Sequence, residues 1–404
     1  MTRAADAGHV AVVDNDGLAK CVAEITSQGR FGLDTEFLRE RTYKPKLCLV
    51  QVSTENKVFV IDPLERVDLE PLAGPIGSHD VEVLVHAGRQ DLELFHEAFG
   101  VVPSCVFDVQ VAAGFAGHGA SLSYGRLVES VLGVALEKGE SYTDWCRRPL
   151  TEKQLTYAAD DVRYLIPAAE ELQAELDEQG RLGWAREELR QFERPEAYVL
   201  DPDEMWRKVG GRGTLSGRQT SVLRELAAWR EETAIRRDIP RGWVVKDPTL
   251  IEIARRLPSS PSALRDIRGM NAKEAEKSGR EILAAVERGK QGPAVEKTRP
   301  PSRSVQARAR MLSGLADAIV RARCEAAGIA TELVVTRGEV ELLMIDLFSL
   351  RGDDVEAKTE ANHRVLQGWR RELAGDAILA LAGGRIGVRA IDEPPYVQEV
   401  ELHG

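Results

Sequence analysis

The first 200 residues alternate short apolar runs with longer stretches of helical spacing. Alternation with a period of two predicts strands, and apolar positions three to four residues apart predict amphipathic helices. Three predicted strands follow one another closely and are separated by turn-like segments, which indicates a mixed sheet. The predicted strands are 9–14, 31–37, 47–54, 58–62 and 81–87, with helical stretches such as 18–28 and 92–99 between them.

Helical spacing dominates after residue 120. Residues 158–182 are predicted to form one long helix that is kinked or interrupted at Pro167, since proline disrupts a helix interior. Residues 193–206 contain two prolines and several acids, which is typical of a connector. Residues 215–288 predict a compact all-helical unit, and the Gly, Pro and charge content of 289–303 indicates a linker.

The last hundred residues begin as a third helical unit. They contain an acidic break at 351–360 and end in a tail, 384–404, to which the sequence pattern assigns no secondary structure. We therefore predict three domains, which cover residues 1–200, 207–290 and 304–404.

Composition narrows the class of protein. Hydrophobic residues make up 43% and charged residues 29% of the 404 residues, as in ordinary globular proteins. No apolar run approaches the roughly 18 residues that a membrane span needs, and the N-terminus lacks the layout of a signal peptide. We expect a cytoplasmic protein without membrane contact. We interpret the five cysteines as reduced, mostly buried thiols, because they show no CxxC pair: Cys21, Cys48, Cys105, Cys146 and Cys324.

Charge is distributed unevenly along the chain. The formal net charge is −11, which argues against a uniformly basic nucleic-acid binder. Residues 214–290, however, hold 16 Lys and Arg against 11 Asp and Glu, a net of +5. We expect contacts with phosphates to begin in this segment.

Two carboxylates lie two residues apart on a predicted strand. Asp34 and Glu36 in GLDTEF point to the same face, where they repel one another unless a cation compensates. Mg²⁺ or Mn²⁺ would supply that compensation, because hard cations take oxygen ligands. Taken alone, such a pair is more often a solvated strand face.

Two further acids join the candidate set. Asp91 opens a helical run, where an acid is also a routine cap. Asp161 lies four residues after Tyr157 and hence on the same helical face, which is also the spacing of an ordinary surface pair. Each signal is weak by itself, and the four acids in this order and context are much stronger together.

The chain resembles the ribonuclease D family of the DEDD exonuclease superfamily over roughly residues 10–175. The resemblance rests on the blocks DTEF, RTYKPKLCLVQVS, HAGRQDL, FDVQVAA, LSYGRLVESVLGVALEKGESYTDW and RRPLTEKQLTYAADDVRYL. The superfamily divides by a Tyr four residues, or a His five residues, before the last Asp. Thr156 occupies the five-before position, so the chain is similar to the tyrosine subclass. The implied fold is a ribonuclease-H-like α/β domain with a mixed five-stranded sheet flanked by helices.

The resemblance implies a two-metal-ion mechanism that hydrolyses phosphodiesters from the 3′ end of RNA and releases nucleoside 5′-monophosphates. Asp34, Glu36 and Asp161 are expected to ligate one Mg²⁺ or Mn²⁺ ion. Asp34 would bridge to a second ion, which Asp91 approaches. Tyr157, whose pKa is ordinarily near 10, is expected to orient the attacking water and to contact the phosphate.

Other aromatic and histidine side chains carry weaker signals. Phe37 and His86 are assigned as substrate contacts, although His86 is more readily interpreted as a partly buried histidine satisfied within the fold. Trp145 is interpreted as a packing anchor and not as a platform for bases.

The helical segment 214–290 resembles the HRDC module, and residues 304–385 resemble its second, more divergent copy in this family. The resemblance implies two all-α HRDC-like domains after the catalytic one. Four cations near Trp243 favour a nucleic-acid contact, with interdomain packing as the alternative: Arg236, Arg237, Arg241 and Lys246.

Taken together, these features predict a 3′-to-5′ exoribonuclease that acts in 3′ maturation of tRNA precursors and other stable RNA, with no obligate protein partner indicated. Two alternatives stay open on the sequence alone. One is a 3′-5′ DNA exonuclease, since the same carboxylates accept either nucleic acid. The other is a catalytically inactive RNA-binding scaffold on the same fold.

Overall fold

The computed structural model describes residues 8–39, 41–136, 143–199, 201–296, 300–349 and 355–402. Two compact units are present. The first comprises Met1–Thr35, Leu49–Ala197 and Pro300–Gly404, and the second comprises Glu36–Cys48 and Tyr198–Arg299. No helix in the described ranges is long and apolar enough to cross a membrane.

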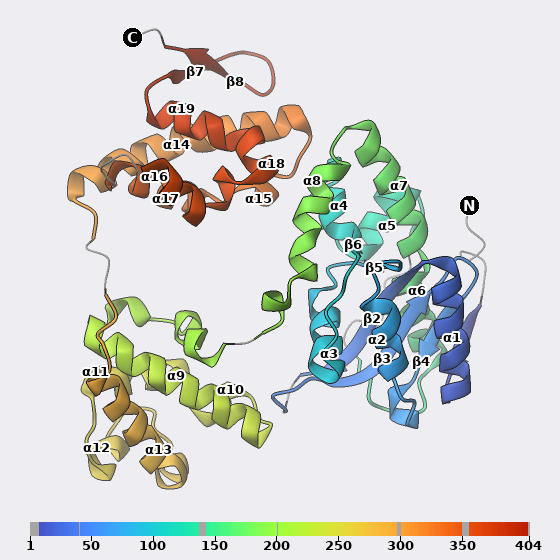
Figure 1. Ribbon diagram of the computed structural model, residues 1–404, viewed down its shortest axis with the longest axis horizontal. Helices are drawn as coiled ribbons and strands as arrows, with labels where there is room; N and C mark the ends of the chain where they lie inside the picture. Colours follow the sequence, from blue (N-terminus) through green and yellow to red (C-terminus); the bar gives the residue numbers. More distant parts are fainter. Residues whose placement is uncertain are drawn as a thin grey trace. The chain divides into compact units, whose positions relative to one another are not determined.

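A mixed sheet forms the centre of the first unit (Figure 1). Its order in the described chain is β1-β4-β3-β2-β5-β6, with β1–β4, β2–β5 and β5–β6 parallel and β3–β4 antiparallel. All five predicted strands are present, and β6 is a sixth, short strand. The strands are β1 His9–Val12, β2 Arg30–Leu38, β3 Lys46–Ser53, β4 Val58–Ile61, β5 Glu82–Val85 and β6 Val106–Asp108.

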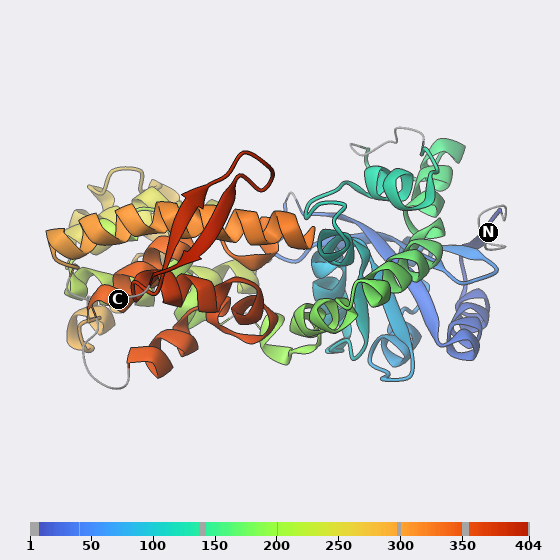
Figure 2. The same cartoon turned by 90° about the horizontal axis from the view of Figure 1, so that it is seen from above.

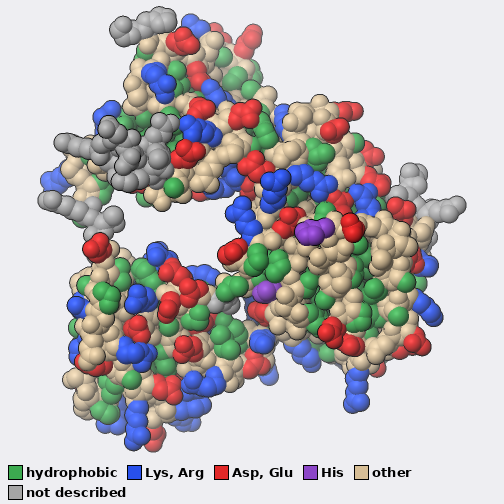
Figure 3. All heavy atoms as spheres, in the orientation of Figure 1, with side chains coloured by type: hydrophobic (Ala, Val, Ile, Leu, Met, Phe, Trp, Pro, Cys, Tyr) green, Lys and Arg blue, Asp and Glu red, His purple; other side chains and the backbone are tan. Residues whose placement is uncertain are grey.

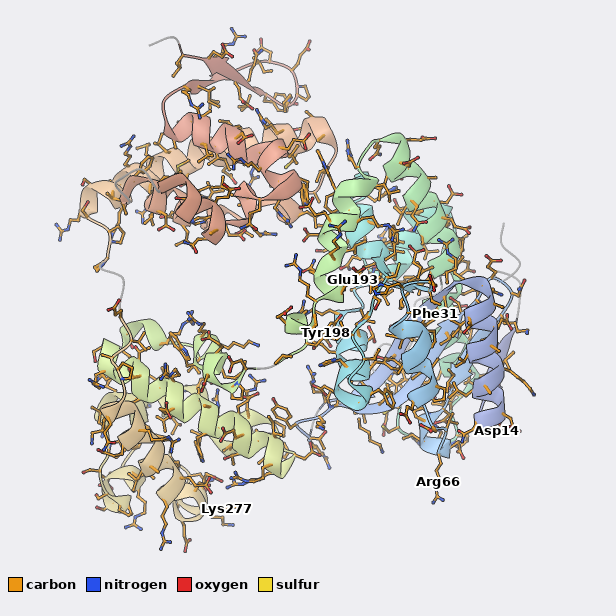
Figure 4. All side chains as sticks on the ribbon, viewed as in Figure 1. Asp14, Phe31, Arg66, Glu193, Tyr198 and Lys277 are labelled. Atoms are coloured by element: carbon orange, nitrogen blue, oxygen red, sulfur yellow. The ribbon has the colours of Figure 1, made fainter. Side chains whose placement is uncertain are left out.

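Helices follow the strands of this unit. They are α1 Asn15–Gln28, α2 Ala73–Ile76, α3 Arg89–Phe99, α4 Val109–Ala116, α5 Tyr124–Leu132, α6 Glu152–Arg163, α7 Leu165–Glu178 and α8 Leu182–Leu189. Asp14, labelled in Figure 4, caps the start of α1: its side chain accepts a hydrogen bond from the Gly17 amide at 2.7 Å.

The predicted interruption of the long helix occurs between α6 and α7. Tyr164 leaves helical geometry (φ −104°, ψ 5°), three residues before Pro167. A proline ring clashes with the carbonyl four residues earlier, here that of Arg163, the last residue of α6. Pro167 itself lies in the first turn of α7, where a missing N–H costs nothing.

The C-terminal helices belong by their contacts to the same unit as the sheet. The Ala330 amide donates to the Gly114 carbonyl at 3.0 Å, and Trp369 lies against Phe115 and Trp184. These helices are α14 Arg303–Ala327, α15 Thr331–Val334, α16 Arg337–Ser349, α17 Val355–Asn362, α18 Gly368–Arg370 and α19 Asp376–Ala382.

The tail without predicted structure is an antiparallel hairpin. Strands β7, Ile386–Ala390, and β8, Val397–Glu401, pair in register and lie against α14 (Figure 2). Arg323 of α14 holds the hairpin by a two-pronged contact with Glu399 (2.5 and 2.9 Å). In the acidic break, residues 355–360 are part of α17, and 351–354 lie outside the described residues.

The second unit is a helical bundle built around α9. Ser216 and Gln219 form a capping box at the start of α9, and Leu226 and Trp229 of this helix pack in a buried apolar cluster with Ile282 of α13. The segment 36–48 joins this bundle, where the Tyr43 hydroxyl donates to Glu231 at 2.5 Å. The helices are α9 Gly217–Arg237, α10 Arg241–Val244, α11 Asp247–Arg256, α12 Pro261–Arg265 and α13 Ala272–Gln291.

The prediction that all five cysteines are reduced thiols is wrong for two of them. Cys48 and Cys146 are disulfide-bonded in the structure, whereas Cys21, Cys105 and Cys324 are free.

Candidate active site

Strand β2 presents the first pair of acids. Its alternation buries Phe31, Leu33 and Thr35 on one face, whereas Asp34 and Glu36 on the other face stay partly exposed. The two acids therefore lie on one face of an internal strand, as the sequence predicts.

Asp91 of α3 contacts β2 through the side chain of Thr35. It lies in the first turn of α3, and only 7% of it is exposed. The Thr35 hydroxyl donates a hydrogen bond to its carboxylate. Burial raises the pKa of the Asp91 carboxyl to about 6, against the lowering effect of that hydrogen bond. A carboxyl so desolvated is one that a cation would stabilise in its charged form.

The turn before α3 is held by Asp108, which the sequence analysis did not identify. Its buried carboxylate accepts from the amides of Ala87 and Gly88, both at 3.1 Å, and caps α4 through the Gln110 amide at 2.9 Å. Ala87 has φ +53°, and a Cβ on Gly88 would lie 2.3 Å from Val85 Cβ, so the turn is tightly specified. An Asp directly before a helical run, as in FDVQVAA, predicts a helix cap. It does not predict that Asp108 also binds the amides of the turn before α3.

Helix α6 carries Tyr157 and Asp161. The Tyr157 side chain hydrogen-bonds Asp161 one turn later, as their spacing predicts. The pKa of Asp161 is raised to about 7, chiefly by burial and also by the nearby charge of Asp160, against the lowering effect of the hydrogen bond from Tyr157. Trp145 is buried with its ring centroid 6.0 Å from that of Tyr157, which confirms it as a packing anchor.

Tyr124 of α5 lies between two of these motifs and also escaped the sequence analysis. Burial raises the pKa of its hydroxyl well above the usual value, and the charges of Asp161 and Asp34 raise it further. The hydroxyl accepts a hydrogen bond from the Tyr164 amide at 3.2 Å, where α6 gives way to α7. Tyr124 is therefore a neutral residue that brings the β2 and α6 acids to a common neighbour.

His86 is satisfied within the fold, in line with the first interpretation of this residue. Its Nε2 lies 2.9 Å from the Leu122 carbonyl, and its ring meets that of Tyr124 edge-on at 5.4 Å. Burial lowers the pKa of this imidazole, partly offset by the charge of Asp108. Phe37, the other assigned substrate contact near the site, is half-buried toward the end of β2.

The chemistry of this donor set fits divalent cations. Every candidate ligand is a carboxylate, which suits hard ions, and burial raises the pKa of two of them, Asp91 and Asp161. Within the described ranges, no three acidic, His or Cys side chains already stand close enough together to hold a metal ion. Carboxylates repel one another in the absence of a cation, so a gathered cluster is not expected before an ion binds.

The four predicted cations of the second unit differ in what they contact. Arg237 makes a nearly buried ion pair with Glu274 (2.9 Å) and bonds Ser278, and Arg236 and Arg241 pair with Glu281 and Glu231. Lys246 is exposed and makes no ion pair within the described chain. Lys and Arg side chains are interspersed with Asp and Glu over the face of this unit seen in Figure 3.

A groove of about 1210 Å³ lies next to Lys246 in the same unit. Its walls include Trp243, whose side chain is 61% exposed, and Arg268. Of the residues predicted to bind substrate in this unit, Lys246 alone lines the groove.

Comparison with known proteins places the chain in a family. A family model for 3′-5′ exonucleases matches residues 9–177, and one for HRDC domains matches residues 219–286. Ribonuclease D of Gluconacetobacter diazotrophicus is 36% identical over 405 residues, which cover 96% of each chain. The chain belongs to the ribonuclease D family. The enzyme of Acidiphilium cryptum is also 36% identical, over 94% of this chain and 95% of its own.

Solved structures agree with this assignment. The crystal structure of Escherichia coli RNase D, an exoribonuclease involved in structured RNA processing, is 31% identical, with a TM-score of 0.79 that covers 94% of this chain and 99% of that one. The catalytic core of RRP6 from Trypanosoma brucei is 23% identical with a TM-score of 0.53, over 70% of this chain and 80% of its own, and shows the fold alone.

Membership of the ribonuclease D family confirms the predicted fold and the predicted activity. The chain is a 3′-5′ exoribonuclease, so its substrate is RNA, and exonucleases of this kind use divalent metal ions. The family also decides between the two nucleic acids that the carboxylates alone left open.

Proposed function

We propose that Asp34, Glu36, Asp91 and Asp161 hold two divalent ions, Mg²⁺ or Mn²⁺, at which RNA is hydrolysed from its 3′ end into nucleoside 5′-monophosphates. The observation that carries this proposal is that two of the four acids, Asp91 on α3 and Asp161 on α6, are desolvated. When bound, the ions would lower the pKa of the attacking water and neutralise charge on the phosphate and the leaving oxygen.

The protein's own groups would hold and orient the reactants. The Tyr157 hydroxyl, which hydrogen-bonds Asp161, lies where it can position a water or a phosphate oxygen. An ordinary tyrosine pKa near 10 makes it a poor base at neutral pH, so we assign it an orienting role. Asp108 acts further out by fixing the turn from which Asp91 projects.

The proposed substrates are the 3′ ends of structured RNAs such as tRNA precursors. Two observations support contacts beyond the reacting nucleotide. Residues 214–290 carry a net charge of +5, and the groove that includes Trp243 and Lys246 offers an exposed ring beside an exposed cation. The compartment in which the enzyme would meet these RNAs is proposed to be the cytoplasm.

End-labelled oligomers test the activity directly. Purified full-length protein should release nucleoside 5′-monophosphates one at a time from the 3′ end of RNA in Mg²⁺ or Mn²⁺, and EDTA should abolish the release. RNA and DNA of one sequence, labelled at either end, separate the alternatives. Preferential trimming of DNA would support a DNA exonuclease, and RNA binding without cleavage would support an inactive scaffold.

Substitutions test the individual roles. Asp34→Asn and Asp161→Asn should lower Mn²⁺ affinity and reduce the rate by orders of magnitude, whereas Tyr157→Phe should reduce the rate and leave Mn²⁺ affinity near normal. Asp160→Asn is the matched control, because this neighbouring carboxylate pairs with Arg163 at 2.8 Å. Near-normal turnover of Asp34→Asn would contradict the proposed ligand set.

A further inference from the structure

Strand β3 carries buried polar atoms that lack partners. Gln51 is fully buried, and neither Oε1 nor Nε2 of its amide makes a hydrogen bond. The hydroxyl of Ser53, two residues on and hence on the same face, is also buried and unpartnered. Buried amides nearly always have partners, so these atoms indicate an interaction that the resting fold does not complete.

The strand register places Gln51 beside Asp34. Residues 39–45 join β2 to β3, and because parallel neighbours need a crossover of a dozen or more residues, the two strands run antiparallel. A Cβ on Gly32 would lie 2.2 Å from Ser53 Oγ, so these two residues face each other. Two steps along the ladder, Asp34 and Gln51 therefore face each other, on the same side of the sheet.

No alternative partner is available to the amide from the neighbouring ladder position. On its other side Gln51 pairs in register with Val60, whose side chain is apolar. The same face is closed near Gly32 by Leu165 of α7, also apolar. The polar group that faces Gln51 from the adjoining strand is the Asp34 carboxylate.

We infer that Gln51 is a positioning residue: when an ion binds, its amide Nε2 would donate a hydrogen bond to the Asp34 carboxylate and fix the orientation of that carboxylate. This inference rests on the proposed function, in which Asp34 is one of the carboxylates that would hold the ions. A ligating carboxylate presents one oxygen lone pair to the ion and needs a donor on the remaining ones to fix its angle. An amide is suited to this role because it donates without adding charge.

The test compares two positions on the same strand face in the full-length protein. Gln51→Leu and Gln51→Met remove the donor, and Ser53→Ala removes the other unpartnered group without touching the residue opposite Asp34. Mn²⁺ affinity is measured by calorimetry without RNA, together with the Tm and with kcat and KM on a single-stranded RNA. Asp34→Asn is measured in the same series.

Both Gln51 variants should keep or raise the Tm, because a buried unpartnered group is removed, and should weaken Mn²⁺ binding and lower kcat by about 10- to 100-fold with little change in KM. Ser53→Ala should keep or raise the Tm and bind Mn²⁺ normally. Normal Mn²⁺ affinity in the Gln51 variants alongside a loss in Asp34→Asn would overturn the inference and leave the proposed function standing. An equal loss in Ser53→Ala would overturn it as well, in favour of general packing. Normal affinity in Asp34→Asn would instead contradict the proposed function itself.

Discussion

The pKa values of partly or fully buried acids in this protein shift in opposite directions, according to whether a cation lies beside them. Asp91 and Asp161 have raised pKa values of about 6 and 7 because they are desolvated beside neutral groups and other acids. Hydrogen bonds from the Arg364 guanidinium instead lower the pKa of Glu339 to about 2. The comparison separates an acid whose charge a cation of the fold neutralises from two acids that have no such cation among the causes of their pKa shifts.

The ion pair of Glu339 with Arg364 leads to a prediction about acid stability. The folded pKa lies below the ordinary Glu value of about 4.3, so the pair stabilises the fold above that value and loses its effect as the pH falls toward 2. Both side chains are about a third exposed, at 35% and 38%, so screening limits the contribution to about 0.5–1 kcal/mol. Glu339→Gln should lower the free energy of unfolding by that amount at pH 6, and the gap to wild type should narrow toward pH 3.

Denaturant unfolding at a series of pH values measures this gap. Glu341→Gln, two residues on in the same helix and without an ion pair in the described chain, serves as the control and should show little change. A gap for Glu339→Gln that stays constant from pH 6 to pH 3 would rule out the ion pair as its cause.

Residues of the candidate site differ in how far the sequence reveals them. Asp34 and Glu36 are predictable because strand alternation is local, and Tyr157 with Asp161 because helical spacing is local. Tyr124 and Gln51 are not, since the first depends on a contact with Tyr164, 40 positions away, and the second on strand register. Neither contact leaves a periodic signal in the sequence.

The helices and strands also differ in how far local sequence predicts them. The five strands and the break near Pro167 follow from alternation and from proline sterics, which act within a few residues. The β7–β8 hairpin escapes prediction because each strand has only five residues and is fixed by packing on α14, through the Arg323 contact with Glu399. A two-stranded hairpin is only marginally stable unless another element supports it.

The packing of the short helix α18 depends on one large buried side chain, that of Trp369. Trp369 is 2% exposed, its ring meets Phe115 of α4 edge-on at 4.7 Å and stacks on Trp184 of α8 at 5.9 Å. Truncation of such a side chain removes a large buried area and leaves a cavity. Trp369→Ala should therefore lower the free energy of unfolding of the first unit by about 3–5 kcal/mol.

Thermal or denaturant unfolding followed by near-ultraviolet circular dichroism measures this loss. Trp243→Ala is the control of the same residue type, because 61% of that side chain is exposed, and should change stability by roughly 0.5 kcal/mol or less. Equal effects of the two substitutions would show that the α18 contacts contribute little to the first unit.

At the scale of the whole chain, the net charge does not show where a phosphate could bind. Residues 214–290 are net positive in a chain of net charge −11, yet several of their cations are already committed to ion pairs. The sequence shows the excess of positive charge but not which cations are available, because pairing depends on the packing of α9 against α13. Availability, more than the total, decides which residues can contact phosphate.

Arg237 is held in an ion pair with Glu274, whereas Lys246 is exposed, so substitutions of the two should have different effects. Lys246→Ala should weaken binding to RNA of any sequence and make the dependence of log affinity on log salt shallower by about one unit, as loss of one phosphate contact does. Arg237→Ala should instead destabilise the second unit, on the order of 3 kcal/mol, because it leaves the nearly buried Glu274 unpaired.

Lys277, exposed on α13 outside the residues that line the groove, provides the control (Figure 4). Fluorescence anisotropy with RNA in EDTA, at several salt concentrations, separates the three. If Lys246→Ala and Lys277→Ala gave the wild-type slope alike, the groove would not contact phosphate, and the second unit would act in packing alone.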